Sequence, residues 1–164
     1  MILSIVFTLI LIELMVVAWI DYKTEKISNK WILANVLISV VLHASVRTLY
    51  PFSWEVLLFP VGFIIVGFLL YLLNIMGAGD SKFLASLFLI VPLEFHLMFF
   101  SKIVISTIVV GATLLILRLI KHGPQLKAYF VSQYWEGVKT TLKSRFSYAP
   151  VIFIAWILMG MEIW

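Results

Sequence analysis

Residues 55–83 read EVLLFPVGFIIVGFLLYLLNIMGAGDSKF, a membrane-length apolar run that ends in a glycine-rich turn, an aspartate and a lysine. Asp80 is the unusual residue, because an ionisable group at membrane depth costs several kcal/mol unless a cavity, a partner or a raised pKa relieves it. A second aspartate, Asp21, closes the first apolar run of the chain. Two carboxylates at matching ends of two apolar segments suggest a catalytic pair.

The composition places the whole chain in the membrane class. Of 164 residues, 63% are hydrophobic and 12% are charged, and the mean hydropathy is +1.13. At ~20 residues per spanning helix, this length leaves room for about six spans and no separate soluble domain. We therefore predict an all-α, polytopic membrane helix bundle formed by a single domain over residues 1–164.

Hydropathy divides this domain into six predicted spans. They lie near residues 1–20, 31–49, 55–75, 83–99, 102–120 and 148–164. The first is expected to be a retained span, since it lacks the basic region and cleavage site of a signal peptide. After a break at Gly123 and Pro124, apolar residues recur at every fourth position among lysines, which predicts an amphipathic helix on the cytosolic leaflet near 121–147.

The basic residues set the expected orientation, because segments rich in lysine and arginine stay in the cytosol. Most of the twelve fall on alternate connections, namely Lys23, Lys26, Lys30, Lys82, Arg118, Lys121, Lys127, Lys139, Lys143 and Arg145. We therefore expect both termini outside the cell and both aspartates at the cytosolic face. Topology and anionic lipid account for the net charge of +4, so no nucleic-acid partner is expected.

Several other kinds of site find little support in the sequence. Cysteine is absent and the three histidines are scattered, so neither a disulfide nor a metal site is predicted. No cofactor is expected, because the chain has no glycine-rich phosphate loop and no zinc-binding helix signature. No serine comes with a histidine and an acid at readable positions, which disfavours a serine mechanism.

The glycines beside Asp80 have a predicted structural purpose. Gly77 and Gly79 permit positive φ and close backbone approach, so the chain can turn and hold Asp80 inward. If the bundle brings Asp21 close, the two like charges cannot both ionise and would share a proton. One carboxyl group would act as a base toward water and the other as an acid toward the scissile carbonyl, as in aspartic proteases. Plainer readings stay open, with Asp21 as an interfacial carboxylate and Asp80 with Ser81 as helix caps.

These motifs resemble those of the type IV prepilin peptidases, which are aspartic intramembrane proteases of the GxGD kind. Residues 76–83 fit the family pattern Gly-x-Gly-Asp-x-Lys at every defined position. Asp21, Ile27 and Asn29 fit the first family motif, in which a serine at position 28 replaces the usual proline. Residues 147–150, read SYAP, are similar to a final motif in which serine again stands for proline.

The resemblance implies a substrate and a place in the cell. It implies removal of the basic leader from a type IV prepilin or pseudopilin at the cytosolic side of the bacterial inner membrane, usually just after a glycine. The absence of cysteine and the short first connection resemble the short form associated with tight-adherence (Tad/Flp) pili, so N-methylation is not expected. The expected partners are this substrate and membrane lipid, and a homo-oligomer is left open.

Supporting roles are assigned to residues near the two aspartates. Lys82 is expected to lower the cost of a charged intermediate or to contact the peptide backbone, with a snorkelling, topology-setting lysine as the alternative. Asn29 is expected to brace the Asp21 loop rather than to bind substrate. The residues with a substrate or packing role are Ile27, Tyr148 and Pro150.

Other polar residues occur inside the predicted spans. Glu13 lies eight residues, or roughly 12 Å of helix rise, before Asp21, and a protonated or helix-bridging role is favoured over a substrate contact. Asn35, Ser39 and His43 recur every four residues along one helix face, a spacing that suits hydrogen bonds between helices.

One function of a different class stays open from the sequence. Aspartates at the edge of the membrane could bind a proton or a cation in a small transporter. The combination of the two aspartate motifs favours the protease.

Overall fold

The computed structural model describes residues 2–24, 26–73, 76–132 and 148–163. Within these ranges the chain forms helices and turns and contains no strand. The α-helices are α1 (Ile2–Thr24), α2 (Asn29–Ser45), α3 (Leu58–Leu72), α4 (Ala78–Phe88), α5 (His96–Val131) and α7 (Ala149–Ile163). Two short 3₁₀ helices, η1 (Trp54–Leu57) and η2 (Leu93–Phe95), lead into α3 and α5.

Three helical segments are long and apolar enough to cross a membrane. They are Ile2–Thr24, Trp54–Leu72 and Leu93–Gln125, and α7 is a shorter apolar helix. Their outward side chains are largely apolar and exposed, which suits a surface that faces lipid. The predicted all-α membrane bundle is confirmed.

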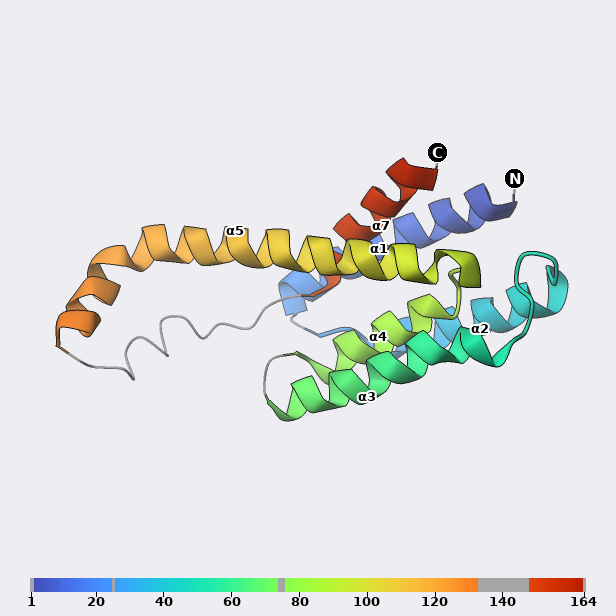
Figure 1. The fold of residues 1–164 in the computed structure, drawn as a ribbon, viewed down its shortest axis with the longest axis horizontal. Coiled ribbons are helices and arrows are strands. Elements are labelled where there is room, and N and C mark those ends of the chain that lie inside the picture. Colours follow the sequence, from blue (N-terminus) through green and yellow to red (C-terminus); the bar gives the residue numbers. More distant parts are fainter. Residues whose placement is uncertain (1, 25, 74–75, 133–147, 164) are drawn as a thin grey trace.

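The helices pack around α4, which lies in the interior of the bundle (Figure 1). It packs against α3 on one side and α2 on another, while α7 packs against both α1 and α5. In α4, residues 80, 81 and 83–88 are buried, so Asp80 and Ser81 of its first turn are removed from solvent. The end of α1 and the starts of α4 and α7 lie at the same side of the bundle (Figure 1).

An aromatic cluster holds α4 to its neighbours. The Phe88 ring of α4 stacks on Phe59 and Phe63 of α3, with ring centroids 5.1 and 5.0 Å apart. It also contacts Phe99 of α5 at 5.0 Å, and Phe99 meets Trp156 of α7 edge to face at 5.3 Å. Each such pair stabilises the fold by about 0.5–1.5 kcal/mol beyond the contribution of the area that it buries. The cluster therefore joins four helices.

Polar side chains along α2 bind α4, as their spacing predicts. The Asn35 amide donates to Ser86 Oγ at 3.1 Å, and Ser39 Oγ donates to the Leu89 carbonyl at 2.9 Å. The third residue of this face, His43, instead bonds Ser39 within α2. Interhelical hydrogen bonding is therefore confirmed for Asn35 and Ser39.

The segment predicted as a span near 83–99 is not one helix. Helix α4 ends at Phe88, a turn follows, and α5 begins at His96. Pro92 explains the division, because it disfavours helical geometry in the residue before it and has no N–H to donate. The His96 ring bonds the Val91 carbonyl at 3.0 Å, which satisfies a backbone group that the interrupted helix leaves open.

The predicted break at Gly123 and Pro124 is also absent. Helix α5 contains Pro124 and continues to Val131. An internal proline removes one backbone hydrogen bond and bends a helix without having to end it, and the ribbon changes direction in its orange C-terminal turns (Figure 1). The rest of the predicted amphipathic segment, residues 133–147, lies outside the described residues.

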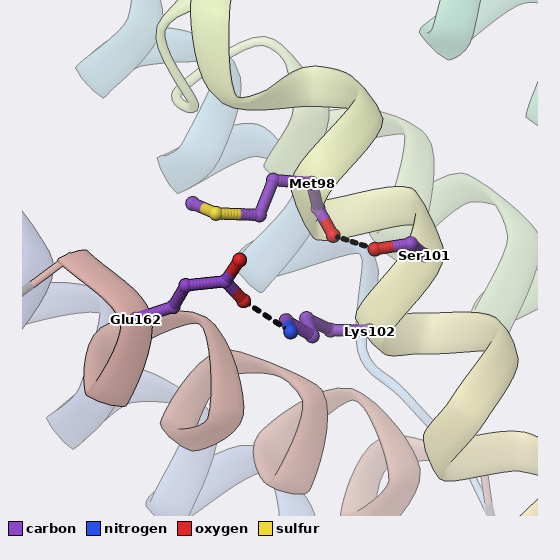
Figure 2. Close-up of polar contacts among 4 residues, drawn as sticks. All are labelled: Met98, Ser101, Lys102 and Glu162. Carbon is purple, nitrogen blue, oxygen red and sulfur yellow. Dashed lines mark hydrogen bonds and ion pairs between the residues drawn. The ribbon is translucent and has the colours of Figure 1, made fainter.

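Polar contacts attach α7 to its neighbours along its length. Figure 2 shows Lys102 of α5 in an ion pair with Glu162, in the last turn of α7. Near the middle of α7, the Trp156 ring nitrogen donates to the Phe7 carbonyl of α1 at 3.1 Å. A partly exposed ion pair contributes at most about 1 kcal/mol, so α7 is held mainly by its apolar packing.

Gly67 allows a close approach between α3 and α4. A Cβ at position 67 would overlap both Oγ and Cβ of Ser81, the residue next to Asp80. Gly62, one and a half turns earlier in α3, faces open space, with nothing within 4 Å of such a Cβ. A methyl group would therefore clash with α4 at Gly67 but fit freely at Gly62.

We expect Gly67→Ala to destabilise the protein by about 1–3 kcal/mol, because the added methyl group forces α3 and α4 apart. The control Gly62→Ala should change stability by no more than about 1 kcal/mol, in the favourable direction, since alanine is the better helix former. Thermal unfolding of both variants in detergent measures the difference. Equal stabilities for the two variants would contradict the assigned contact.

Candidate active site

Asp21 lies in the last turn of α1 and is buried, with 3% of its surface exposed. Its Oδ2 accepts a hydrogen bond at 3.3 Å from the backbone N–H of Ala149, the first residue of α7. The first N–H groups of a helix lack partners within the helix and attract negative charge. Asp21 therefore joins the end of the first helix to the start of the last.

Asp80 lies in the first turn of α4 with 9% of its surface exposed. Its Oδ2 accepts a hydrogen bond at 3.2 Å from the backbone N–H of Gly77, the residue that caps the helix. Asp80 is thus both the buried carboxylate that the sequence predicts and a hydrogen-bond acceptor for the first residue of the helix start, Gly77. The cap residue itself is Gly77, not Asp80 or Ser81 as the plainer reading had it.

The glycines of this motif provide space and not an unusual backbone angle. Gly77 has φ −72° and ψ 142°, and no described glycine lies in the left-handed region, so the structure does not use the positive φ that glycine permits. A Cβ at Gly77 would lie 2.9 Å from Asp80 Oδ2, which would displace the carboxylate. A Cβ at Gly79 would lie 3.4 Å from the Ile27 carbonyl, so α4 packs closely on the segment that follows Asp21.

The two carboxylates interact electrostatically. Burial, followed by the negative charge of Asp21, raises the pKa of Asp80 from 3.8 to about 6, while the hydrogen bond from Gly77 opposes the rise. Asp80 lies outside the three long apolar segments. A pair in which one carboxyl group holds a proton at mildly acidic pH is suited to combined acid and base catalysis.

Tyr148 borders the same region from the residue before α7. Its hydroxyl lies 2.8 Å from Thr107 Oγ1 on α5. Because Thr107 donates its own proton to the Ile103 carbonyl at 2.7 Å, Tyr148 is the donor in this pair. Burial, and to a smaller extent the charge of Asp80, raises the pKa of Tyr148. Pro150 lies in the first turn of α7, where a missing N–H costs little.

Two predicted supporting residues are exposed, unlike the two buried carboxylates. Lys82 is the exposed residue of α4, and two positions along a helix place it about 200° around the axis from Asp80. Asn29 is exposed as the first residue of α2, after the cap residue Ser28, whose hydroxyl accepts from Lys30 N at 3.3 Å. Their assigned roles stay predictions.

Two contributors to the site were missed from the sequence. Thr107 orients the Tyr148 hydroxyl, and the backbone of Ala149 binds Asp21. Nothing in the sequence distinguishes Thr107 from the other residues of its apolar run. Ala149 lies within the SYAP pattern, which could have indicated it as a site residue. Among the described residues, no group of three or more histidine, aspartate or glutamate side chains is placed to hold a metal ion.

Comparison with known proteins gives one match. A family model described as the type IV leader peptidase family matches residues 6–123, which is more than half of the chain and includes both aspartates. The match ends before Tyr148. No curated protein and no solved structure matches the chain significantly.

We expect Asp80→Asn to stabilise the protein at a pH above 6. A carboxyl group with a folded-state pKa of about 6 and an unfolded value of 3.8 holds more protons when folded, so stability falls as pH rises between these values. Two pKa units correspond to about 3 kcal/mol, which the neutral asparagine avoids.

Thermal unfolding of the wild type and Asp80→Asn across this pH range measures the effect. The advantage of the variant should vanish below pH 3.8, where wild-type Asp80 is protonated in both states. A difference that does not vary with pH would show that Asp80 is not held in its neutral form.

Proposed function

Because this chain belongs to the type IV leader peptidase family, we propose that it is an aspartic endopeptidase in which Asp21 and Asp80 activate water. One observation carries the proposal: two buried carboxylates from different helices interact, and the pKa of Asp80 is raised to about 6. Family membership gives the transporter alternative no support, since the matched family is one of peptidases.

The two carboxylates take different parts in the proposed reaction. Asp21, as the carboxylate, accepts a proton from water while the water oxygen bonds to the scissile carbonyl carbon. Asp80, as the acid, gives its proton to the carbonyl oxygen, which produces a neutral tetrahedral diol. When the C–N bond breaks, Asp21 gives its proton to the leaving nitrogen, and a diol hydroxyl returns a proton to Asp80. One water is consumed and both carboxyl groups regain their starting states.

The position of the site supports cleavage at the cytosolic face. The end of α1 and the starts of α4 and α7 lie together at one side of the bundle (Figure 1). Three lysines lie at that side: Lys23 in the last turn of α1, Lys26 in the connection that follows and Lys30 in the first turn of α2. Arg47 follows the other end of α2. Because basic connections stay in the cytosol, this side faces the cytosol in the proposed arrangement.

The proposed substrate is the leader of a type IV prepilin or pseudopilin in the bacterial inner membrane. The family name supports a leader peptide as the part removed. Absence of cysteine and the short connection after α1 fit the short form found with tight-adherence (Tad/Flp) pili, and we attribute to this chain peptidase activity alone.

Replacing either aspartate should abolish processing of a co-expressed prepilin. We expect Asp21→Asn and Asp80→Asn each to lower the cleavage rate by roughly 10²–10⁴-fold, because each removes the acid or the base. Immunoblotting follows the loss of the leader, and mass spectrometry of the product locates the cleaved bond. Glu162→Gln, at the opposite end of α7, is the matched control and should cleave normally.

Normal processing by both asparagine variants would overturn the proposed mechanism. Unfolding curves of the purified variants establish that any loss of cleavage is not a loss of fold.

A further inference from the structure

Glu13 of α1 and Asn35 of α2 form a polar contact in which Asn35 and the Oε1 atom of the half-buried Glu13 are removed from solvent. Asn35 of α2 is 0% exposed, and its side chain lies close enough to the Glu13 side chain of α1 to hydrogen-bond with it. The Asn35 amide nitrogen also donates to Ser86 Oγ of α4 at 3.1 Å. Side chains of three helices therefore meet here, and two of these helices carry Asp21 and Asp80.

Two oxygens in this contact lack a donor. Glu13 Oε1 and Asn35 Oδ1 are both buried, and no hydrogen-bond donor reaches either one within the described part of the chain. Ser86 cannot supply a proton, because its hydroxyl donates to the Phe83 carbonyl at 2.7 Å. A buried acceptor without a donor costs about 1–3 kcal/mol, and a buried ionised carboxylate costs more.

A single proton would satisfy both oxygens. A carboxylic acid complements a primary amide, because the acid O–H can donate to the amide oxygen while the amide N–H donates to the other acid oxygen. We propose that Glu13 carries a proton on Oε1 and donates it to Asn35 Oδ1, which completes a bridge from Glu13 through Asn35 to Ser86. Glu13 is then a positioning residue that fixes the helix of Asp21 relative to the helix of Asp80.

The rest of the packing shows why Glu13 matters in this bridge. Helix α2 is already bound to α4 by the hydrogen bond from Ser39 to the Leu89 carbonyl. Asn35 and Ser86 add a second link between the same two helices. Glu13 is the member that brings α1 into the network. This inference rests on the proposed function, because the spacing of the two helices affects catalysis only if Asp21 and Asp80 act as a pair.

Infrared spectroscopy tests the protonation of Glu13 without any measurement of cleavage. In the Asp80→Asn background, at neutral pH, we expect a carbonyl band of a protonated carboxylic acid that disappears on further replacement Glu13→Gln. Glu162→Gln is the matched control and should leave the band unchanged, because Glu162 forms an ion pair with Lys102 (Figure 2). Absence of a band that depends on Glu13 would overturn the proposal.

Cleavage kinetics in the wild-type background test the positioning role. Glu13→Gln should retain cleavage, because its amide can make both hydrogen bonds to Asn35. Glu13→Leu removes both bonds, and a misplacement of about 1 Å lowers kcat by about a hundredfold, with KM unchanged. Ser86→Ala should also lower kcat, by a smaller factor than Glu13→Leu. This variant tests the positioning role if Glu13→Leu does not fold. Wild-type kcat in the folded Ser86→Ala and Glu13→Leu variants would overturn the positioning role.

The two proposals fail separately. If Asp21→Asn and Asp80→Asn both cleave, the proposed catalytic pair is wrong while the infrared result for Glu13 stands. If those variants are inactive and the Glu13 band is absent, the catalytic pair stands and the bridge is wrong.

Discussion

A carboxylate that is withdrawn from water has to find its hydrogen bonds within the protein, and both Asp21 and Asp80 find one in a backbone N–H at the start of a helix. This requirement explains much of the architecture. Helix α4 has to begin where its neighbours leave room for the Asp80 side chain, which is why Gly77 has no side chain of its own. Helix α7 has to begin beside the end of α1, so the last helix of the chain packs along the first. Burial, followed by the proximity of the like charge on Asp21, then raises the pKa of Asp80.

Some parts of this arrangement could be predicted from the sequence, because a single large energetic effect decides each of them. Apolar runs of membrane length predict helices because lipid offers no partner for an open backbone. The cost of a buried charge singled out Asp80, and the four-residue spacing on α2 predicted the hydrogen bonds of Asn35 and Ser39. The purpose of Gly77 was predicted only in part, because the sequence does not distinguish a glycine required for its backbone angle from one required for space.

The features that could not be predicted depend on contacts between distant segments, or on opposing energetic effects of similar size. The hydrogen bond between Asp21 and Ala149 joins residues 128 positions apart, and a backbone donor leaves no trace in residue type. Pro92 ends one helix whereas Pro124 lies inside another, since the outcome depends on whether the surroundings satisfy the freed backbone groups. The exposure of Lys82 depends on how α4 is rotated in the bundle, which a motif does not specify.

The length of α5 has a consequence for the membrane around the enzyme. Its 36 residues correspond to a helix of about 54 Å, whereas the hydrocarbon core of a bilayer is ~30 Å thick. A helix longer than the core tilts or emerges from it, by an amount that varies with the lipid. Because Thr107 of α5 bonds Tyr148, the residue before Ala149, a change in the tilt of α5 would displace a contact next to the backbone group that binds Asp21. We therefore expect the position of Tyr148 to change with the thickness of the bilayer.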